Sequence, residues 1–207
     1  MHRTSVAALL VALAPATAGA QDAGDAEARQ WSVSAAVAVY GLPEEGNYAQ
    51  PTVTADRGPL HLEARYNYEA LRTASLWAGY SMRGGRRVEW ALTPMVGAVF
   101  GGTDGVAPGY VASLSWWKVD AYIEGEYVFA GISEDRFAYH WSEAAIAPFN
   151  WLRAGLVTQR TRAYATERSI QRGPFVNATV ERIDAAVYVF IGERSEPTFV
   201  VSIGWDF

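Results

Sequence analysis

A histidine and a serine stand two positions apart in the segment His140-Trp141-Ser142. In a β-strand this spacing places both side chains on the same face. A neutral imidazole removes the proton of a neighbouring hydroxyl, so His140 would act as the base and Ser142 as the nucleophile that attacks an ester. A histidine and a serine that only share a hydrogen bond in a polar interior would show the same spacing.

Charged and polar residues also recur at every second position in longer segments. In residues 60–69 and 119–129 they alternate with apolar residues, which separates the two sets onto opposite faces of a strand. An arginine that faces lipid at the middle of a bilayer costs about 2–4 kcal/mol, so in a membrane-spanning strand the polar set must face inward. The predicted lumen-lining residues are Glu63, Arg65, Asn67, Arg87, Glu89, Asp120, Tyr122, Glu124, Glu126, Arg153, Gln159, Asn177, Glu181 and Asp184.

Turn signatures divide the chain into segments of similar length. They fall at residues 57–59, 84–85, 117–118, 148–150 and 181–182. The repeat of about 30 residues accommodates two membrane strands of about 9–11 residues with one turn and one loop. Five such turns, with both termini at one end, predict an all-β protein, a closed antiparallel up-and-down transmembrane β-barrel of about 12 strands, with about 8 or 10 strands as alternatives.

The C-terminal segment has the most regular alternation in the chain. Phe199, Val201, Ile203, Trp205 and Phe207 are separated by single residues that are smaller or polar. This segment resembles the closing strand of Gram-negative outer-membrane β-barrel proteins, which ends in a Phe after alternating apolar residues and is recognised by the assembly machinery. The resemblance implies that residues 31–207 form a barrel in contact with outer-membrane lipids and that these five residues are the assembly signal. A soluble lipocalin-like barrel or a sandwich would instead turn its apolar face inward.

The first residues have the features of a secretory signal peptide. A polar start is followed by an apolar run over residues 6–14, by Pro15, and by the small residues Ala18-Gly19-Ala20. The run is shorter than the roughly 18 residues that a membrane-spanning helix needs. We therefore expect residues 1–20 to be a signal peptide, residues 21–30 to be a periplasmic lead-in, and both ends of the barrel to be periplasmic.

The composition excludes several classes of site. The chain has 17 basic and 22 acidic residues, which provides no basic surface for nucleic acid. It contains no Cys and only three His, so thiolate and histidine-rich metal sites are excluded, and we predict no metal and no cofactor. The 8 Trp, 11 Tyr and 8 Phe residues suffice for the aromatic girdles of a membrane barrel.

The His-x-Ser spacing resembles that of outer-membrane phospholipase A and of the lipid A deacylase barrels, in which the histidine activates the serine. Those enzymes have an Asn after the serine and hold the pair on the lipid side, whereas Glu143 follows Ser142 here. Tyr139 and Trp141 have the character of lipid-facing girdle residues, which predicts that His140 and Ser142 face the lumen. The opposite parity, with Glu143 inward, is the alternative.

Three functions are compatible with these features. The predicted lining is more acidic than basic, which favours a porin-like, passive and narrow channel for small polar solutes or cations. One alternative is an outer-membrane lipid hydrolase that uses His140 and Ser142. The other is a closed structural barrel without transport, in which the interior charges pair with one another.

Overall fold

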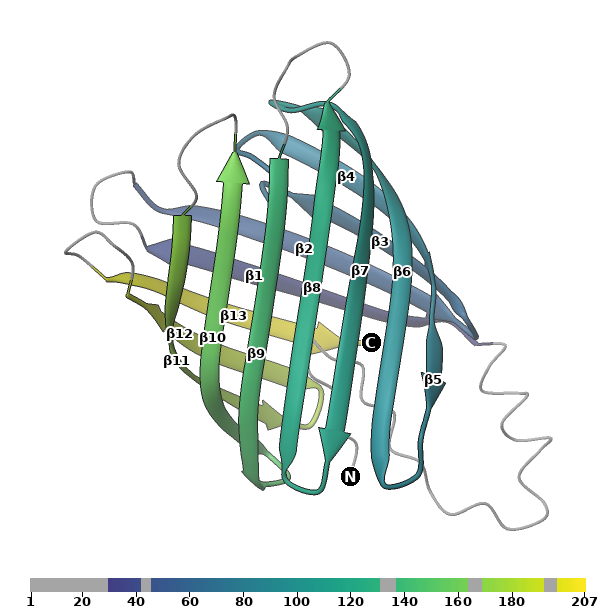
Figure 1. The fold of residues 1–207 in the computed structure, drawn as a ribbon, viewed down its shortest axis with the longest axis vertical. Coiled ribbons are helices and arrows are strands. Elements are labelled where there is room, and N and C mark those ends of the chain that lie inside the picture. The colour runs from purple at the N-terminus through teal and green to yellow at the C-terminus, as the bar shows by residue number, and fades with distance from the viewer. Residues whose placement is uncertain (1–29, 42–45, 131–136, 164–168, 192–196) are drawn as a thin grey trace.

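The computed structural model describes residues 30–41, 46–130, 137–163, 169–191 and 197–207. These residues form one antiparallel β-sheet that closes on itself (Figure 1). Within these ranges, no helix is long and apolar enough to cross a membrane. The strands are β1 (Ser32–Gly41), β2 (Tyr48–Arg57), β3 (Leu60–Tyr66), β4 (Thr73–Tyr80), β5 (Met82–Gly84), β6 (Val88–Gly101), β7 (Gly105–Trp116), β8 (Val119–Ala130), β9 (Phe137–Phe149), β10 (Leu152–Ala163), β11 (Ser169–Val180), β12 (Ile183–Phe190) and β13 (Thr198–Asp206).

The thirteen described segments make twelve strands across the barrel wall, because β4 and β5 are one interrupted strand. Both pair with β6, one after the other, and only Ser81 separates them. The amide of Ser81 still donates to the carbonyl of Pro59, so the ladder continues through the interruption. The pairing of β1 with β13 closes the sheet. The prediction of a closed barrel of about twelve strands is confirmed, and the alternatives of about 8 or 10 strands are excluded.

Five tight turns connect the strands at one end of the barrel, which we call the turn end. They lie at residues 58–59, 85–87, 117–118, 150–151 and 181–182, within a few positions of the predicted turns. Trp117 and Glu181 reverse the chain with φ angles of 55° and 53°, in the left-handed region that side chains rarely adopt. The start of β1 and the end of β13 lie at this end too, since Ser34 pairs with Asp206. We call the opposite end the loop end.

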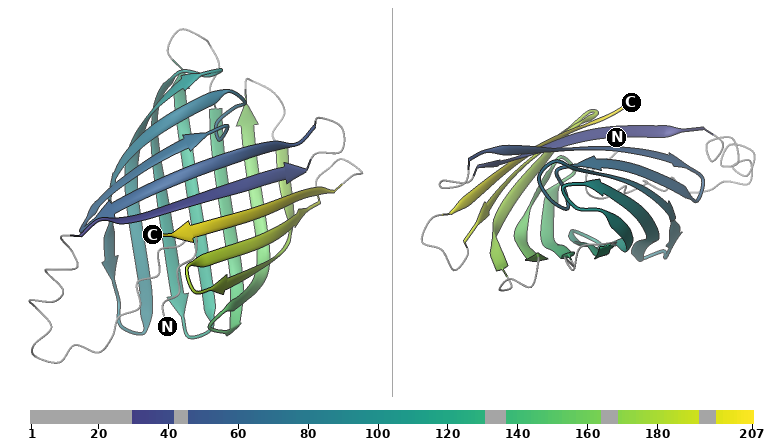
Figure 2. Two further views of the ribbon diagram at one scale, coloured as in Figure 1. Left: turned by 180° about the vertical axis from the view of Figure 1, so that it is seen from behind. Right: turned by 90° about the horizontal axis from the view of Figure 1, so that it is seen from above.

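Alternation along the strands separates an apolar outer face from a polar and aromatic inner face. Strands β6 to β10 form one wall, and β1, β2 and β13 cross them obliquely on the other (Figure 2). The five alternating apolar residues at the C-terminus point outward and are between 44% and 71% exposed, whereas Val200 between them is 1% exposed. A soluble barrel would have the reverse arrangement, with its apolar face inside.

Candidate functional site

A cavity of about 220 Å³ lies inside the barrel. It begins near the turn end, at Asp56 and Asp206, and extends toward the loop end as far as Tyr40. Among the described residues, its wall contains five carboxylates and two basic side chains, His61 and Arg83, so the lining is acidic. The carboxylates are Asp56, Glu63, Glu124, Glu143 and Asp206.

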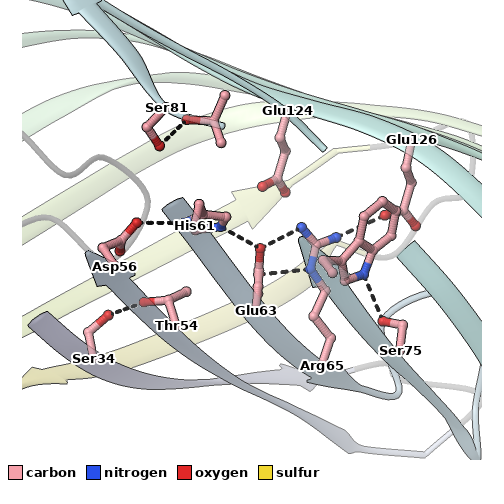
Figure 3. A network of polar contacts seen from close by, with 12 residues as sticks. Ser34, Thr54, Asp56, His61, Glu63, Arg65, Ser75, Ser81, Glu124 and Glu126 are labelled. Carbon is pink, nitrogen blue, oxygen red and sulfur yellow. Dashed lines mark hydrogen bonds and ion pairs between the residues drawn. The ribbon is translucent and has the colours of Figure 1, made fainter. Parts of the chain in front are cut away.

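A chain of charged side chains runs along the inner face of β3 (Figure 3). His61 Nδ1 lies 2.8 Å from Oδ1 of Asp56, its cross-strand partner on β2, and His61 Nε2 lies 3.4 Å from Oε2 of Glu63. Arg65 donates to both oxygens of Glu63, from Nε at 2.8 Å and from Nη2 at 3.0 Å. The odd positions 61, 63 and 65 share one face because side chains alternate along a strand. Each buried charge in this row therefore has an ionisable or oppositely charged neighbour.

The guanidinium of Arg65 also reaches across the lumen to β8. Its Nη1 donates to Oε2 of Glu126 at 2.8 Å, and Arg65 is only 5% exposed. Its Cζ atom lies 4.3 Å from the ring centre of Tyr68 and 4.8 Å from that of Trp77. A guanidinium forms forked hydrogen bonds in its plane while its faces stack on aromatic rings. Arg65 thereby fills the space between β3 and β8.

Trp77 packs beside Arg65 because two glycines leave room for its indole. A Cβ atom at Gly97, the partner of Trp77 on β6, would come within 2.5 Å of the ring, and one at Gly109 on β7 would come within 2.9 Å. A larger residue at either position would therefore displace the ring. Trp77 Nε1 donates to Oγ of Ser75 at 3.0 Å, which satisfies this buried N–H group.

Other aromatic side chains fill the lumen next to Arg65. The rings of Tyr68 and Tyr139 meet edge to face with centres 5.2 Å apart. Trp141 contacts Tyr188 and Phe190 in the same manner, at 5.0 Å and 5.4 Å. We call these side chains and their buried neighbours the packed layer. It consists of Arg65, Tyr68, Trp77, Glu126, Phe137, Tyr139, Trp141, Tyr188 and Phe190.

Glu124 stands where the cavity meets the packed layer. Its Oε1 accepts a hydrogen bond from the hydroxyl of Tyr68, and its Oε2 accepts one from Tyr122 at 2.6 Å. Figure 3 shows its carboxylate pointing into the lumen, and the side chain lines the cavity. Both partners are neutral hydroxyls, so Glu124 contributes an uncompensated negative charge to the cavity wall.

A second buried arginine lies on the wall formed by β8, β9 and β10. Arg153 donates from Nε to Oδ1 of Asp120 at 3.0 Å and from Nη2 to Oε2 of Glu143 at 3.3 Å. The other oxygen of Glu143 accepts hydrogen bonds from Nε1 of Trp141 and from the hydroxyl of Tyr188, both at 3.0 Å. This network ties the packed layer to three strands that are far from β3.

Most predicted lining residues lie on the inner face, but only Glu63, Tyr122 and Glu124 line the cavity. Asn177 instead forms a separate pair, in which its Nδ2 donates to Oδ1 of Asp184 at 2.6 Å. The predicted residues that face inward outside the cavity wall are Arg65, Glu89, Asp120, Glu126, Arg153, Gln159, Asn177 and Asp184.

The prediction is wrong for Asn67, Arg87 and Glu181, which lie in connections between strands. Asn67 has a φ of 57°, and its Oδ1 accepts a hydrogen bond from the amide of Arg72 at 2.7 Å. Arg87 and Glu181 are exposed at the turn end. Alternation assigns a face only while the chain is extended, so it does not apply to a residue in a turn.

Sequence reasoning missed several residues of the cavity wall. Asp56 and Asp206 stand at the ends of their strands, and Arg83 follows the interruption at Ser81. At such places a strand cannot be distinguished from a turn by its pattern. His61 belongs to the same alternating row as Glu63, so the alternation of residues 60–69 is sufficient to place it on the inner face.

The predicted orientation of His140 and Ser142 is wrong, because both face outward and the alternative parity holds. Tyr139 and Trp141 are 8% and 7% exposed inside the barrel, and Glu143 is 3% exposed on the same face. An ionised carboxylate determines the face of β9, because exposure to lipid would cost far more for a charge than for an aromatic ring. Tyrosine and tryptophan suit either face, so they are weaker guides to parity.

The fold defines a class of architecture, the closed twelve-stranded antiparallel β-barrel, which this chain shares with solved outer-membrane porins. The barrel is similar to the KdgM porin, with a TM-score of 0.64 and 10% sequence identity, over 84% of this chain and 99% of that chain. It is also similar to the KdgM porin in complex with disordered oligogalacturonate, with a TM-score of 0.61 and 10% identity, over 85% and 99% of the two chains.

A third similar structure is the outer membrane protein Omp33 of Acinetobacter baumannii. Its TM-score is 0.50 at 9% identity, over 86% of this chain and 98% of that chain. No protein-family model and no curated protein matches the sequence. At this level of identity the similarity concerns the fold, so the function must be argued from the residues of the interior.

Proposed function

We propose that this protein is an outer-membrane channel through which small cations and small polar solutes diffuse passively. The observation that carries the proposal is the acidic cavity inside a porin-type barrel, whose described wall carries five carboxylates. Arginines bind two of these, Glu63 and Glu143, so the wall keeps a net negative charge. Carboxylates that line a pore favour cations over anions. The charge of Glu124, bound by hydroxyls rather than by an arginine, is central to this preference.

The proposed location is the outer membrane, with both termini periplasmic. The apolar outer face supports it, as do the five exposed C-terminal residues, which we propose as the contact with the assembly machinery and with lipid. The proposed signal peptide, residues 1–20, and nearly all of the periplasmic lead-in, residues 21–30, lie outside the described residues. The barrel domain begins at residue 31 in this proposal.

The charge of the cavity also argues for one class of solute. The KdgM porin forms a complex with oligogalacturonate, a chain in which each sugar carries a carboxylate. Five carboxylates in this cavity would repel such a polyanion. The proposed solutes are therefore cationic or neutral, in contrast to that ligand.

The packed layer limits the size of what passes. Arg65 joins Glu63 to Glu126 across the lumen, and the aromatic side chains around it are buried. Passage therefore requires water and ions to move between side chains, which makes the channel narrow. The same packing favours the second candidate, a closed structural barrel without transport.

A lipid hydrolase is not proposed. His140 does face the lipid side, but its Nδ1 lies 3.2 Å from the hydroxyl of Tyr110 rather than being paired with Ser142. The residue after Ser142 is Glu143, which points inward and is bound by Arg153. Neither contact orients His140 for proton transfer from Ser142.

The decisive experiment is single-channel conductance of the refolded mature chain in a planar bilayer under a salt gradient. We expect a small steady current whose reversal potential indicates a preference for cations. A variant with Asp56→Asn, Glu124→Gln and Asp206→Asn should lose this preference, because three cavity charges are removed. The matched control is Asp104→Asn, which neutralises an exposed carboxylate outside the cavity.

A folded, heat-modifiable barrel that carries no current would contradict the channel and leave the closed barrel as the function. A current without cation preference in the unmodified protein would refute the role of the cavity charges. Hydrolysis of phospholipid that is abolished by Ser142→Ala would reinstate the enzyme.

A further inference from the structure

On the described outer face of the barrel, polar side chains gather on neighbouring strands. On β1, β3, β4, β6 and β13, each outward residue is apolar or aromatic, and on β2 only Arg57, at the turn end, is charged. On β9, β10 and β11, by contrast, five outward side chains are polar or charged, and the hydroxyl of Tyr110 on β7 contacts one of them. We call this set the outer patch, and it consists of Tyr110, His140, Ser142, Thr158, Arg160 and Arg172.

Strand register makes the outer patch continuous. Arg160 on β10 is the cross-strand partner of His140 on β9, and Thr158 is paired with Ser142 on one side and with Arg172 on the other. Directly paired residues have Cβ atoms about 4.5–5.5 Å apart, so these side chains lie side by side. Five neighbouring strand positions thus present two guanidinium groups and an imidazole on one surface.

A glycine extends the outer patch to β7. Tyr110 Oη lies 3.2 Å from Nδ1 of His140, across the intervening strand β8. A Cβ atom at Gly125, the residue of β8 that pairs with both, would come within 2.9 Å of that hydroxyl. The missing side chain therefore lets the phenol reach the imidazole and orient it.

The charges of the outer patch have no counter-ion in the described part of the chain. Arg160 and Arg172 are exposed, and the outward positions described on β7 to β12 include no carboxylate. Both arginines lie three positions from the loop ends of their strands. An arginine on the lipid face is costly at the bilayer midplane and nearly free close to the interface, where headgroups are within reach.

We propose that the outer patch binds the phosphate headgroup of a membrane lipid at the loop end of the barrel. Guanidinium groups form forked, charge-assisted hydrogen bonds with phosphate, and the hydroxyls of Ser142 and Thr158 add neutral donors. A second copy of this chain fits less well, because its described outer face offers no carboxylate to pair with the arginines. The proposal depends on membrane location and not on conduction.

The test is lipid binding by the refolded mature chain in detergent micelles, followed by native mass spectrometry. The probes are bisphosphorylated lipid A, the same lipid A with both phosphates removed, and inorganic phosphate as a competitor. We expect the phosphorylated lipid to be retained, and Arg160→Gln with Arg172→Gln to weaken its binding about tenfold or more. The single variants should each give part of this loss. Arg57→Gln with Arg182→Gln, the same change at the turn end, is the matched control.

Each other outcome would overturn the proposal. Equal retention of the dephosphorylated lipid would mean that the acyl chains, not the phosphate, are bound. Full competition by inorganic phosphate at the concentration of the lipid would make the ligand a free anion. An oligomer that dissociates in the double variant, in the absence of any lipid effect, would assign the outer patch to a protein interface. Heat-modifiable migration on a gel shows in each case that the variant is folded.

Discussion

The cavity and the packed layer are neighbours in one lumen, yet they treat charge in opposite ways. Glu124 and Glu126 stand two positions apart on β8 and share its inner face. Glu126 receives a guanidinium from Arg65 across the lumen, whereas Glu124 receives two tyrosine hydroxyls. The role of each carboxylate is therefore decided by what reaches it from the opposite wall.

This difference separates stability from selectivity. In the packed layer, Arg65 binds Glu126 and stacks on the aromatic rings, so a buried cation offsets acidic charge and fills the space. In the cavity, Glu124 is bound by hydroxyls and not by an arginine, and the volume stays open. Breaking a buried ion pair is far more destabilising than removing a solvated charge, so changes in the two regions should have different consequences.

The largest expected effect is that of Arg65→Met in the packed layer. The change leaves Glu63 and Glu126 without their shared cation, and removal of one partner from a buried ion pair costs about 3–5 kcal/mol. We expect the free energy of unfolding to fall by this amount, as measured by tryptophan fluorescence during denaturant titration in lipid vesicles. Addition of Glu126→Gln should recover part of the loss, because it removes one of the orphaned charges.

Arg83→Met is the matched control for that prediction. Arg83 is an exposed arginine at the edge of the cavity, and its loss should change the unfolding free energy by about 0.5 kcal/mol or less. Equal effects of the two changes would show that the packed layer is no more stabilising than the cavity wall.

A smaller effect is expected when the packed layer is overfilled. Gly97→Ala would place a Cβ atom within 2.5 Å of the Trp77 indole, and overpacking of this kind costs about 1–3 kcal/mol. The comparison is Gly41→Ala, where the nearest atom would be 3.6 Å away. Denaturant titration of both variants measures the difference. If Gly97→Ala were as stable as Gly41→Ala, Trp77 would not be tightly held.

The strand number and the two faces were predictable from the sequence because each rests on a local pattern. Turn signatures about every 30 residues identified all five connections at the turn end, and the alternating row that ends at Phe207 identified the outer face. The interruption at Ser81, between β4 and β5, did not affect the predicted number of strands, because the hydrogen-bond ladder continues through it. Local rules of this kind hold whatever the opposite wall contains.

The contacts of the lumen were not predictable, because they join strands that are distant in the sequence. Nothing within β3 shows that Arg65 meets Glu126, which is 61 residues further along. The prediction of which face of β9 points inward was wrong for another reason. Trp141 suits lipid and lumen equally, and only the pairing of Glu143 with Arg153 identifies the inner face. The alternation of side chains and their charges therefore predict which residues face the lumen. The contacts between these residues can be identified only from the three-dimensional structure.

The smallest effect on stability should come from Glu124→Gln, and its comparison with Glu126→Gln is the sharpest test of the two regions. Glu124→Gln keeps a carbonyl as acceptor for two hydroxyls, so it should change the unfolding free energy by about 1 kcal/mol or less, whereas Glu126→Gln also weakens the charge-assisted bond from Arg65, which is worth about 1.5–3 kcal/mol. Only Glu124→Gln should shift the reversal potential toward zero under a salt gradient, because Glu124 lines the cavity, whereas Glu126 is buried outside it and paired with Arg65. Equal shifts would place the packed layer in the ion pathway as a charged filter. If neither variant shifted it, cation preference would have to arise at the remaining carboxylates of the cavity, nearer the turn end.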